Sequence, residues 1–217
     1  MIIFFISQCN YKKIHNTIIE VLEQYHARME RENLSFPVAA PGGRNSVNFQ
    51  SMLAIGPETG QFLNILVHSL TAPRILELGT SFGYSAIWLA EAARATGGHF
   101  TTIEIDPERS AHALDMSTQA GLSPLVDFQI GDAVTLIGNI PGRFDFVFVN
   151  LRKDLYLPCL EVFHSRLAPG AVIVANNIVR PGGPELEAYV QALRTKPGIS
   201  STLLPVGSGL EVSRYQP

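Results

Sequence analysis

The stretch RILELGTSFGYS (residues 74–85) joins a short apolar run to a glycine-containing loop that leads directly into a helical pattern. RILEL has the length and the apolar content of a buried strand. Gly79 and Gly83 permit a tight turn and the close approach of a ligand to the backbone. The order of strand, glycine loop and helix is typical of the first unit of a nucleotide-binding α/β fold.

The rest of the chain repeats this alternation. Further apolar runs of strand length lie at residues 99–105, 126–130, 144–150 and 171–176. Helical stretches are expected at residues 84–96, 107–120, 133–138, 156–167 and 184–194. The alternation predicts right-handed βαβ units and a mostly parallel sheet with helices on both faces. Two short strands around Gly207 and Gly209 predict a hairpin that closes one edge.

The N-terminal part has a different pattern. Apolar residues at steps of three and four predict an amphipathic helix over residues 11–33, and a second helix is expected from Pro57 to about residue 70. Residues 36–50 are rich in Pro, Gly and Asn, which predicts an irregular connection or lid. The apolar opening MIIFFIS lacks the basic region and cleavage site of a signal peptide, so we expect a strand or packing arm.

Composition narrows the function classes. The 217 residues, 46% of them hydrophobic, suit a single domain, with residues 1–56 as a helical or lid extension and residues 57–217 as the core. A net charge of -3 without a basic block indicates a small-molecule partner rather than nucleic acid or a membrane. Cys9 and Cys159 are far apart and outside any CxxC motif, which indicates reduced thiols and a cytoplasmic location.

Two acidic residues at the ends of predicted strands distinguish between cofactors. Glu77 would repel a pyrophosphate but attract the sulfonium and ammonium groups of S-adenosylmethionine (SAM). Glu104 follows Gly79 by 25 residues (104 − 79), near the position from which an acid usually binds both ribose hydroxyls. The pair favours SAM over NAD; the alternative is that Glu77 caps a helix and Glu104 is solvated. GDA (residues 131–133) would lie beside the adenine, although Gly-Asp is also common in ordinary turns.

From residue 53 to residue 214 the sequence resembles the catechol and caffeoyl-CoA type O-methyltransferases, which are class I SAM-dependent enzymes. The resemblance rests on LAIGPETGQFL, ILELGTSFGYSA, TTIEIDPE, GDA, FDFVFVNLRKDLYLP, LAPGAVIVANNIVRPGGP and LLPVGSGLEVSRY. It implies a doubly wound, Rossmann-like sheet of seven strands with an antiparallel edge strand. It also implies methyl transfer from SAM to a small hydroxylated molecule, and a homodimer.

The resemblance further implies a set of cofactor-binding residues. Leu53 and Ile55 would flank the methionine part of SAM, Glu104 would hold the ribose, and Asp132 with Ala133 would meet the adenine. The complete set of candidates is Leu53, Ile55, Glu77, Gly79, Ser81, Gly83, Tyr84, Ser85, Glu104, Ile105, Asp132, Ala133 and Asn150.

Three carboxamides stand where this family holds a divalent cation, usually magnesium. The family uses an Asp at the end of the fourth strand and an Asp-Asn pair at the end of the fifth, and the matching residues here are Asn150, Asn176 and Asn177. Magnesium is usually anchored by one or two carboxylates, and each lost charge beside a cation removes on the order of several kcal/mol. We therefore expect no tightly bound metal. A weak site made by the three carboxamides, or direct hydrogen bonding of the substrate by them, are the alternatives.

Lys153 matches the lysine that this family uses as general base on the substrate hydroxyl. Methyl transfer is an in-line displacement, which requires alignment of the hydroxyl and removal of its proton. Lys153 must be partly neutral to act as a base, and a nearby Arg152 would favour that form. The candidate catalytic residues are thus Lys153, Asn150 and Arg152, and the alternative for Lys153 is a solvated loop lysine.

Pro205 stands where the vertebrate catechol enzymes have a glutamate that binds the second hydroxyl. We therefore expect a single phenolic or other activated hydroxyl rather than a catechol. Two other functions stay open: a catalytically silent cofactor-binding or regulatory protein, and methylation of a modified RNA base. The acidic balance of charges argues against the RNA substrate.

Overall fold

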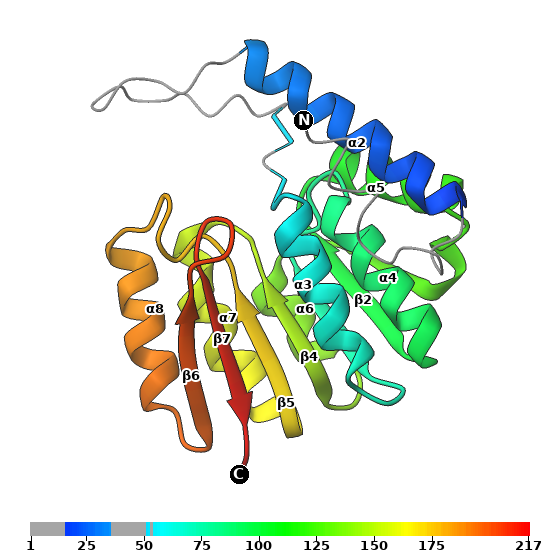
Figure 1. Cartoon of the computed structure of the whole chain (residues 1–217). Coiled ribbons are helices and arrows are strands. Elements are labelled where there is room, and N and C mark those ends of the chain that lie inside the picture. Colours follow the sequence, from blue (N-terminus) through cyan, green and yellow to red (C-terminus); the bar gives the residue numbers. More distant parts are fainter. Residues whose placement is uncertain (1–15, 36–50, 53) are drawn as a thin grey trace.

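The computed structural model of the chain describes residues 16–35, 51–52 and 54–217 (Figure 1). Several sequence predictions lie outside the described residues. They are the N-terminal arm, the first residues of the predicted helix at 11–33, the lid at 36–50 and the role of Leu53.

Seven strands form one sheet in the order β3-β2-β1-β4-β5-β7-β6. They are β1 (Arg74–Leu78), β2 (His99–Glu104), β3 (Val126–Ile130), β4 (Phe144–Val149), β5 (Leu167–Ala175), β6 (Ile199–Leu204) and β7 (Leu210–Tyr215). Strands β1 to β5 pair in parallel, whereas β7 runs antiparallel to both β5 and β6. The predicted doubly wound sheet and its closing hairpin are confirmed. The antiparallel strand lies one place in from the edge, and β6 forms the edge itself.

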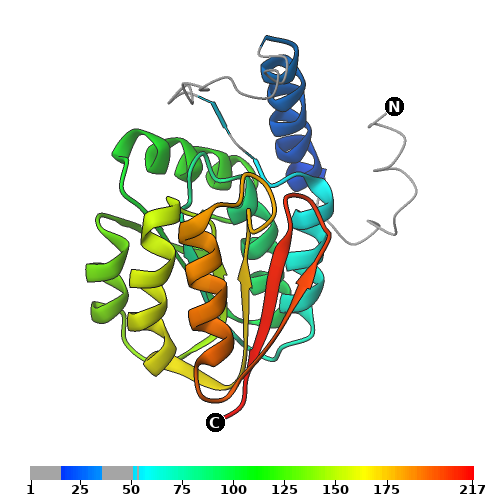
Figure 2. The same cartoon turned by 90° about the vertical axis from the view of Figure 1, so that its left-hand side faces the viewer.

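Helices cover both faces of the sheet (Figures 1 and 2). The α-helices of the described residues are α2 (Asn16–Ser35), α3 (Pro57–His68), α4 (Tyr84–Thr96), α5 (Pro107–Gln119), α6 (Ala133–Asn139), α7 (Tyr156–Phe163) and α8 (Pro184–Thr195). Helices α3, α4 and α5 lie on one face and α6, α7 and α8 on the other, while α2 packs on the outside of α4 and α5. None of the described helices is long and apolar enough to cross a membrane.

The helix predicted at residues 156–167 and the strand predicted at residues 171–176 have different boundaries in the structure. Helix α7 ends at Phe163 and a 3-10 turn follows, because Leu167 already pairs with Phe144 at the start of β5. Strand β5 then ends at Ala175, one residue before Asn176. Pairing in the sheet therefore overrides the helical pattern of the local sequence.

Alternate residues of the strands pack into two apolar layers, as expected for a sheet that is buried on both faces. In β1, Ile75 packs with α2, α3 and α4, whereas Leu76 and Leu78 pack with α6 and α7. Glu77 alternates with these residues and is fully buried on the α4 side. The one acidic residue of β1 therefore lies inside the core, directly below the glycine loop.

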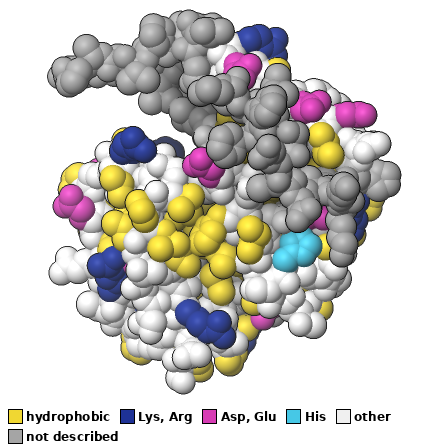
Figure 3. Space-filling model, in the orientation of Figure 1, with side chains coloured by type: hydrophobic (Ala, Val, Ile, Leu, Met, Phe, Trp, Pro, Cys, Tyr) yellow, Lys and Arg dark blue, Asp and Glu magenta, His cyan; other side chains and the backbone are white. Residues whose placement is uncertain are grey.

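The sheet is less covered at its β7-β6 end. On the α3 side, the described helices leave β6 and β7 open, and hydrophobic side chains gather on this face (Figures 1 and 3). Val172, Val206 and Val212 are partly exposed there, and Ile65 on α3 is 66% exposed.

Candidate cofactor and catalytic site

The candidate site lies at the carboxyl ends of the central strands. The order of strands reverses between β1 and β4, and ligands of doubly wound sheets bind at such a point. Two backbone hydrogen bonds join the strand ends: Asn150 N donates to Leu78 O at 2.9 Å, and Asn176 N donates to Val149 O at 3.0 Å. The loops after β1, β4 and β5 therefore start side by side.

The loop after β1 has a tightly constrained backbone. A Cβ atom on Gly79 would lie 2.3 Å from the carbonyl oxygen of Asn150, so only glycine lets the loop approach β4 this closely. Ser81 has a φ of 52° and Gly83 a φ of 92°. A left-handed conformation costs a non-glycine residue roughly 1–2 kcal/mol. The hydrogen bond from Ser81 N to Glu104 Oε2, at 2.7 Å, helps to hold this conformation.

Glu104 organises the end of β2. Its buried carboxylate accepts hydrogen bonds from the backbone N–H groups of Ser81, Ile105 and Asp106. A carboxylate has about four acceptor positions, so one remains for a ligand hydroxyl. Gly131 N donates to Glu104 O at 2.9 Å, which brings the loop after β3 to the same place.

Asp132 and Ala133 lie at the start of α6. Asp132 is exposed and caps the helix, because its Oδ1 accepts a hydrogen bond from Thr135 N at 2.9 Å. The carboxylate thus has the ordinary turn role that the sequence left open, whereas Ala133 is buried. Asp132 and Ala133 directly follow Gly131, whose N–H donates to Glu104 O, so both residues lie close to the end of β2.

Glu77 is a buried carboxylate whose two oxygens have different surroundings in the described structure. Its Oε2 accepts a hydrogen bond of 2.6 Å from Thr102 Oγ1, and Thr80 Oγ1 lies 2.6 Å from the same hydroxyl. Oε1 has no hydrogen bond of normal geometry within the described part of the chain. Burial raises the pKa of Glu77 to about 7, against the lowering effect of Ser85 and Thr102. A buried acid with an unsatisfied oxygen fits a cationic partner, which would favour its ionised form.

The three carboxamides of the sequence prediction form one cluster. Nδ2 of Asn176 and Nδ2 of Asn177 both donate to Asn150 Oδ1, each at 3.1 Å. Asn176 is 3% exposed, and its Oδ1 has no partner among the residues that the structure describes. Tyr156 on α7 supports the cluster from below, since its hydroxyl donates to Asn176 O at 3.1 Å. Within the cluster, Asn150 Oδ1 thus accepts two N–H donors, whereas Asn176 Oδ1 accepts none from the described residues.

Lys153 and Arg152 lie beside this cluster but have different partners. Lys153 is half-buried, and its Nζ donates to the carbonyl oxygen of Gly182 in the loop before α8. Arg152 is exposed and forms two hydrogen bonds with Asp154, at 2.8 and 3.1 Å. Arg152 thus faces Asp154, and the hydrogen bonds of the described residues do not join it to Lys153.

The loop after Asn177 and the β6-β7 turn form a common wall. Ile178 N donates to Gly209 O at 3.1 Å, and Val179 N donates to Ser208 O at 3.0 Å. The backbone at Gly207 also approaches α3, since a Cβ there would lie 2.5 Å from Thr59 Oγ1 and 3.6 Å from Ile55 O. Ile55 therefore lies near this turn.

Comparison with known proteins assigns this arrangement to a family. A model of the O-methyltransferase family matches residues 44–215. The chain belongs to this O-methyltransferase family. The class predicted from the sequence is thereby confirmed.

Two catechol O-methyltransferases and one solved structure show how close the relationship is. The enzyme of Niastella koreensis is 34% identical over 134 residues, and the match spans 60% of each chain. The enzyme of Mycobacterium tuberculosis is 31% identical over 163 residues, or 70% of this chain and 74% of that protein. TomG, the Streptomyces achromogenes O-methyltransferase involved in tomaymycin synthesis and solved in complex with SAM, has a TM-score of 0.77 and 25% identity, covering 99% of this chain and 95% of that one.

Some site residues of this O-methyltransferase were not predicted from the sequence. Thr102 is the direct neighbour of Glu77 in the parallel pairing of β1 and β2. The two predicted strands would have suggested the contact once their register was known. Tyr156 lies in an apolar helix and carries no local signal that its hydroxyl supports Asn176.

The raised pKa of Glu77 predicts a pH-dependent stability. Because the folded-state value of about 7 exceeds the ordinary value of 4.5, the folded protein binds a proton that the unfolded chain has lost between these pH values. The resulting contribution of Glu77 to the free energy of unfolding is fully present below pH 4.5 and is lost as the pH rises through 7. A Glu77→Gln variant lacks this dependence, so its unfolding free energy relative to wild type should rise by about 2–3 kcal/mol between about pH 5 and pH 8.

Urea unfolding at several pH values measures this difference. The exposed Glu108 provides the control, since the rise in Glu77→Gln should clearly exceed any rise in Glu108→Gln. A rise in Glu77→Gln no larger than in Glu108→Gln would contradict the raised pKa.

Proposed function

We propose that this protein transfers a methyl group from SAM to a hydroxyl of a small phenolic molecule, with little or no dependence on a divalent metal. The observation that carries the cofactor assignment is the pair of buried acids, Glu77 and Glu104, on either side of a glycine loop at the switch point of the sheet. Phosphate-containing cofactors would meet two carboxylates there, whereas SAM is cationic at its methionine end and has a ribose to offer to Glu104.

The residues present fit SAM. Glu104 has one acceptor position left for a ribose hydroxyl, and Oε1 of Glu77, which has no partner among the described residues, favours the positive end of the cofactor. The close approach of Gly79 to Asn150 leaves no room for a side chain at residue 79, so that a ligand would meet backbone at this point. Asn150 connects the cofactor side to the catalytic side, since its backbone bonds to β1 and its side chain to Asn176 and Asn177.

Bound SAM would supply the methyl group on a sulfonium, and the chain must align the acceptor and take its proton. Lys153 is the proposed general base, because it is half-buried, follows Asn150 by three residues and carries an amine held at the loop before α8. Its hydrogen bond to Gly182 O fixes the position of Nζ. Arg152, paired with Asp154, is assigned to the wall of the substrate pocket rather than to proton transfer.

The donor set at the strand ends does not suit a tightly bound magnesium ion. Asn150, Asn176 and Asn177 carry no charge, and two N–H groups point at Asn150 Oδ1. A cation at that oxygen would first have to displace both donors. Magnesium sites usually contain at least one carboxylate, and no group of three or more His, Cys, Asp or Glu side chains able to hold a metal occurs in the described residues. We therefore propose that the carboxamides hydrogen-bond the substrate.

The same cluster limits the substrate. A catechol is normally recognised by two oxygens that chelate a cation, and the exposed Pro205 offers no second anchor. We propose a molecule with one reactive phenolic or otherwise activated hydroxyl. Its pocket would be walled by Arg152 and by the joined loops at residues 178–179 and 208–209.

A cytoplasmic homodimer remains part of the proposal, but with a different basis. The apolar side of α2 does not provide a free interface, because Ile18, Val21, Leu22 and Tyr25 are buried within the same chain. Support now comes from the hydrophobic side chains on the open β5-β7-β6 face, where Val172, Val206 and Val212 are partly exposed (Figure 3).

Methyl transfer to a panel of simple phenols tests the proposed function. We expect transfer from radiolabelled SAM in excess EDTA at a rate within about twofold of that in magnesium, since the carboxamides provide no charge for the ion. A monohydric phenol should react as well as the corresponding catechol. SAM binding without transfer to any phenol would favour the catalytically silent alternative, and loss of transfer in EDTA would contradict metal independence.

Restoring the two missing charges should create a metal site. We expect the double variant Asn150→Asp/Asn176→Asp to bind magnesium at least about tenfold more tightly than wild type, because two carboxylates would again face the ion. Calorimetric titration with magnesium chloride measures this gain. The variant Asn139→Asp, at the exposed end of α6, adds charge elsewhere and should show no gain. Equal affinity in the wild type and the double variant would contradict the charge argument.

Removing the amine of Lys153 should affect catalysis more than cofactor binding. We expect Lys153→Met to lower kcat by about 10²–10⁴-fold, the usual contribution of a positioned base, with the Kd for SAM little changed. Lys196 is a matched control, because this lysine pairs with Glu161 on the surface. If Lys153→Met kept the same kcat as Lys196→Met, Lys153 would only anchor the loop at Gly182.

A further inference from the structure

Helix α2 makes direct polar contacts with the loop after β1. The hydroxyl of Tyr25 donates to the carbonyl oxygen of Phe82 at 2.6 Å. One turn of the helix also carries His26, whose Nε2 lies 2.9 Å from the hydroxyl of Tyr84. The guanidinium of Arg28 lies over the Phe82 ring, 4.1 Å from its centroid. Three neighbouring residues of α2 therefore contact residues 82–84, where the loop after β1 joins α4, more than 50 residues away in sequence.

The Phe82 carbonyl is a sensitive point of this loop. It lies between Ser81 and Gly83, which both have positive φ angles of 52° and 92°. Residues in such conformations persist only when the surrounding contacts fix them. Burial raises the pKa of Tyr25 far above its ordinary value, so the hydroxyl stays protonated and acts as a donor. His112 on α5 supplies a second contact to the same carbonyl, at 3.2 Å through Nδ1.

The contact between Tyr25 and the loop also requires that residue 83 has no side chain. A Cβ at that position would lie 3.1 Å from the Tyr25 hydroxyl and 2.7 Å from the Cβ of Ala113. Gly83 is also the residue from which α4 begins. The hydroxyl of Tyr25 therefore rests on the junction between the loop and α4, where Ser81 N reaches Glu104 two residues earlier.

The same helix holds the segment before α3. The carboxylate of Glu32 accepts hydrogen bonds from Met52 N at 2.9 Å and Ser51 Oγ at 3.1 Å, and it pairs with Arg28 at 2.8 Å. Arg28 in turn covers Phe82. A continuous set of contacts thus links the loop after β1 to residues 51–52, which come just before Ile55.

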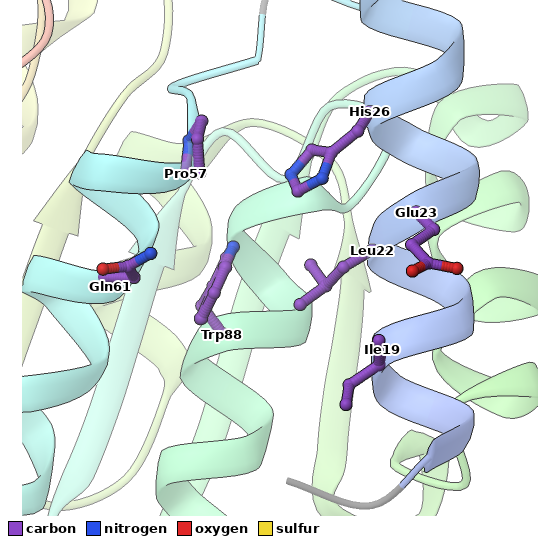
Figure 4. Close-up of a pocket in the computed structure, with 7 residues that line it drawn as sticks. All are labelled: Ile19, Leu22, Glu23, His26, Pro57, Gln61 and Trp88. Carbon is purple, nitrogen blue, oxygen red and sulfur yellow. The ribbon is translucent and has the colours of Figure 1, made fainter. Parts of the chain in front are cut away.

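Packing on the remaining side of α2 is looser. A small cavity separates α2 from α3 and α4, and its lining consists of Ile19, Leu22, Glu23, His26, Pro57, Gln61 and Trp88 (Figure 4). His26 and Leu22 reach across this space toward α4 (Figure 4). Helix α2 is therefore not packed tightly against α3. The position of α2 depends more on its polar contacts with the loop after β1 than it would in a tightly packed helix pair.

We propose that Tyr25 is a positioning residue that holds the loop at residues 79–85 in its cofactor-binding conformation, and that α2 is the element through which it acts. The inference rests on the proposed function, in which this loop binds SAM. Tyr25 acts through the backbone of Phe82 and needs no contact with the cofactor itself. Its loss should weaken SAM binding while leaving the rate of the bound complex intact.

A Tyr25→Phe variant tests this role, because it removes the hydroxyl and keeps the aromatic ring that packs edge-on against Tyr84 at 5.5 Å. We expect the Kd and the KM for SAM to rise about three- to tenfold, as for the loss of one buried hydrogen bond, with kcat little changed. Hydrogen exchange of the amides at residues 79–85 should become faster, while exchange in β1 and β4 stays the same.

Two control variants separate positioning from general destabilisation. Tyr189→Phe also removes a buried tyrosine hydroxyl, one without a hydrogen-bond partner among the described residues, and it lies on α8. Thr17→Val removes the contact of α2 with the carbonyl oxygen of Ala120, the C-cap residue of α5, but does not touch the loop. Both variants should bind SAM as the wild type does.

The outcomes distinguish this inference from the proposed function. Unchanged Kd and KM for SAM in Tyr25→Phe would overturn the inference, and so would an equal rise in Tyr189→Phe or a fall in kcat with KM unchanged. In each of these cases the wild type still binds SAM, and the proposed function stands. A wild-type protein that did not bind SAM would overturn both.

Discussion

The buried carboxylate of Glu77 is the constraint around which this end of the sheet is arranged. A carboxylate loses much of its hydration in the core, and the cost is reflected in a pKa raised to about 7. In the described part of the chain, Oε2 accepts a hydrogen bond from Thr102, which is itself 2.6 Å from the Thr80 hydroxyl, whereas Oε1 is left without a partner. The start of α4 lies close by, and the positive end of that helix dipole favours a negative charge. The hydrogen bond from Thr102 and the start of α4 reduce the free-energy cost of ionising Glu77 but do not remove it. A cationic ligand would offset the rest of this cost.

Charge is distributed unevenly across the site. The cofactor side retains two buried acids, Glu77 and Glu104, whereas the strand ends on the other side carry only the carboxamides of Asn150, Asn176 and Asn177. A carboxamide both donates and accepts hydrogen bonds, so the three side chains bond to one another in a way that two carboxylates and one carboxamide would not. This difference explains why the fold accommodates the change. In the proposed function, it also moves the recognition of the acceptor from metal chelation to hydrogen bonding.

Much of the fold followed from local signals in the sequence. RILEL and VDFQI have the boundaries of β1 and β3, because the first is a mostly apolar run and the second alternates apolar and polar residues, and a loop follows each. The start of α4 was predictable because Gly83 ends the loop there. The end of α7 was not, because it depends on the pairing of Leu167 with Phe144. Resemblance and strand position together brought Glu77, Glu104 and Asn150 to one edge, but partners such as Asp154 for Arg152 depend on side-chain geometry.

The role of α2 illustrates the same limit. The spacing of Ile18, Val21, Leu22 and Tyr25 indicates an amphipathic helix and treats all four as apolar packing residues. Nothing in this spacing shows that the hydroxyl of one of them meets a carbonyl 57 residues away. Contacts of that kind arise only when two elements that are distant in sequence dock, so they become visible with the structure.

The most direct test of the account is the proton balance of SAM binding. Calorimetric titrations with SAM at about pH 6.5, in buffers of different ionisation enthalpy, measure how many protons the protein releases on binding. If a cationic ligand ionises Glu77, binding should release up to about one proton, and Glu77→Gln should abolish the release. Binding with no release of protons, or with equal release in the variant, would contradict the account.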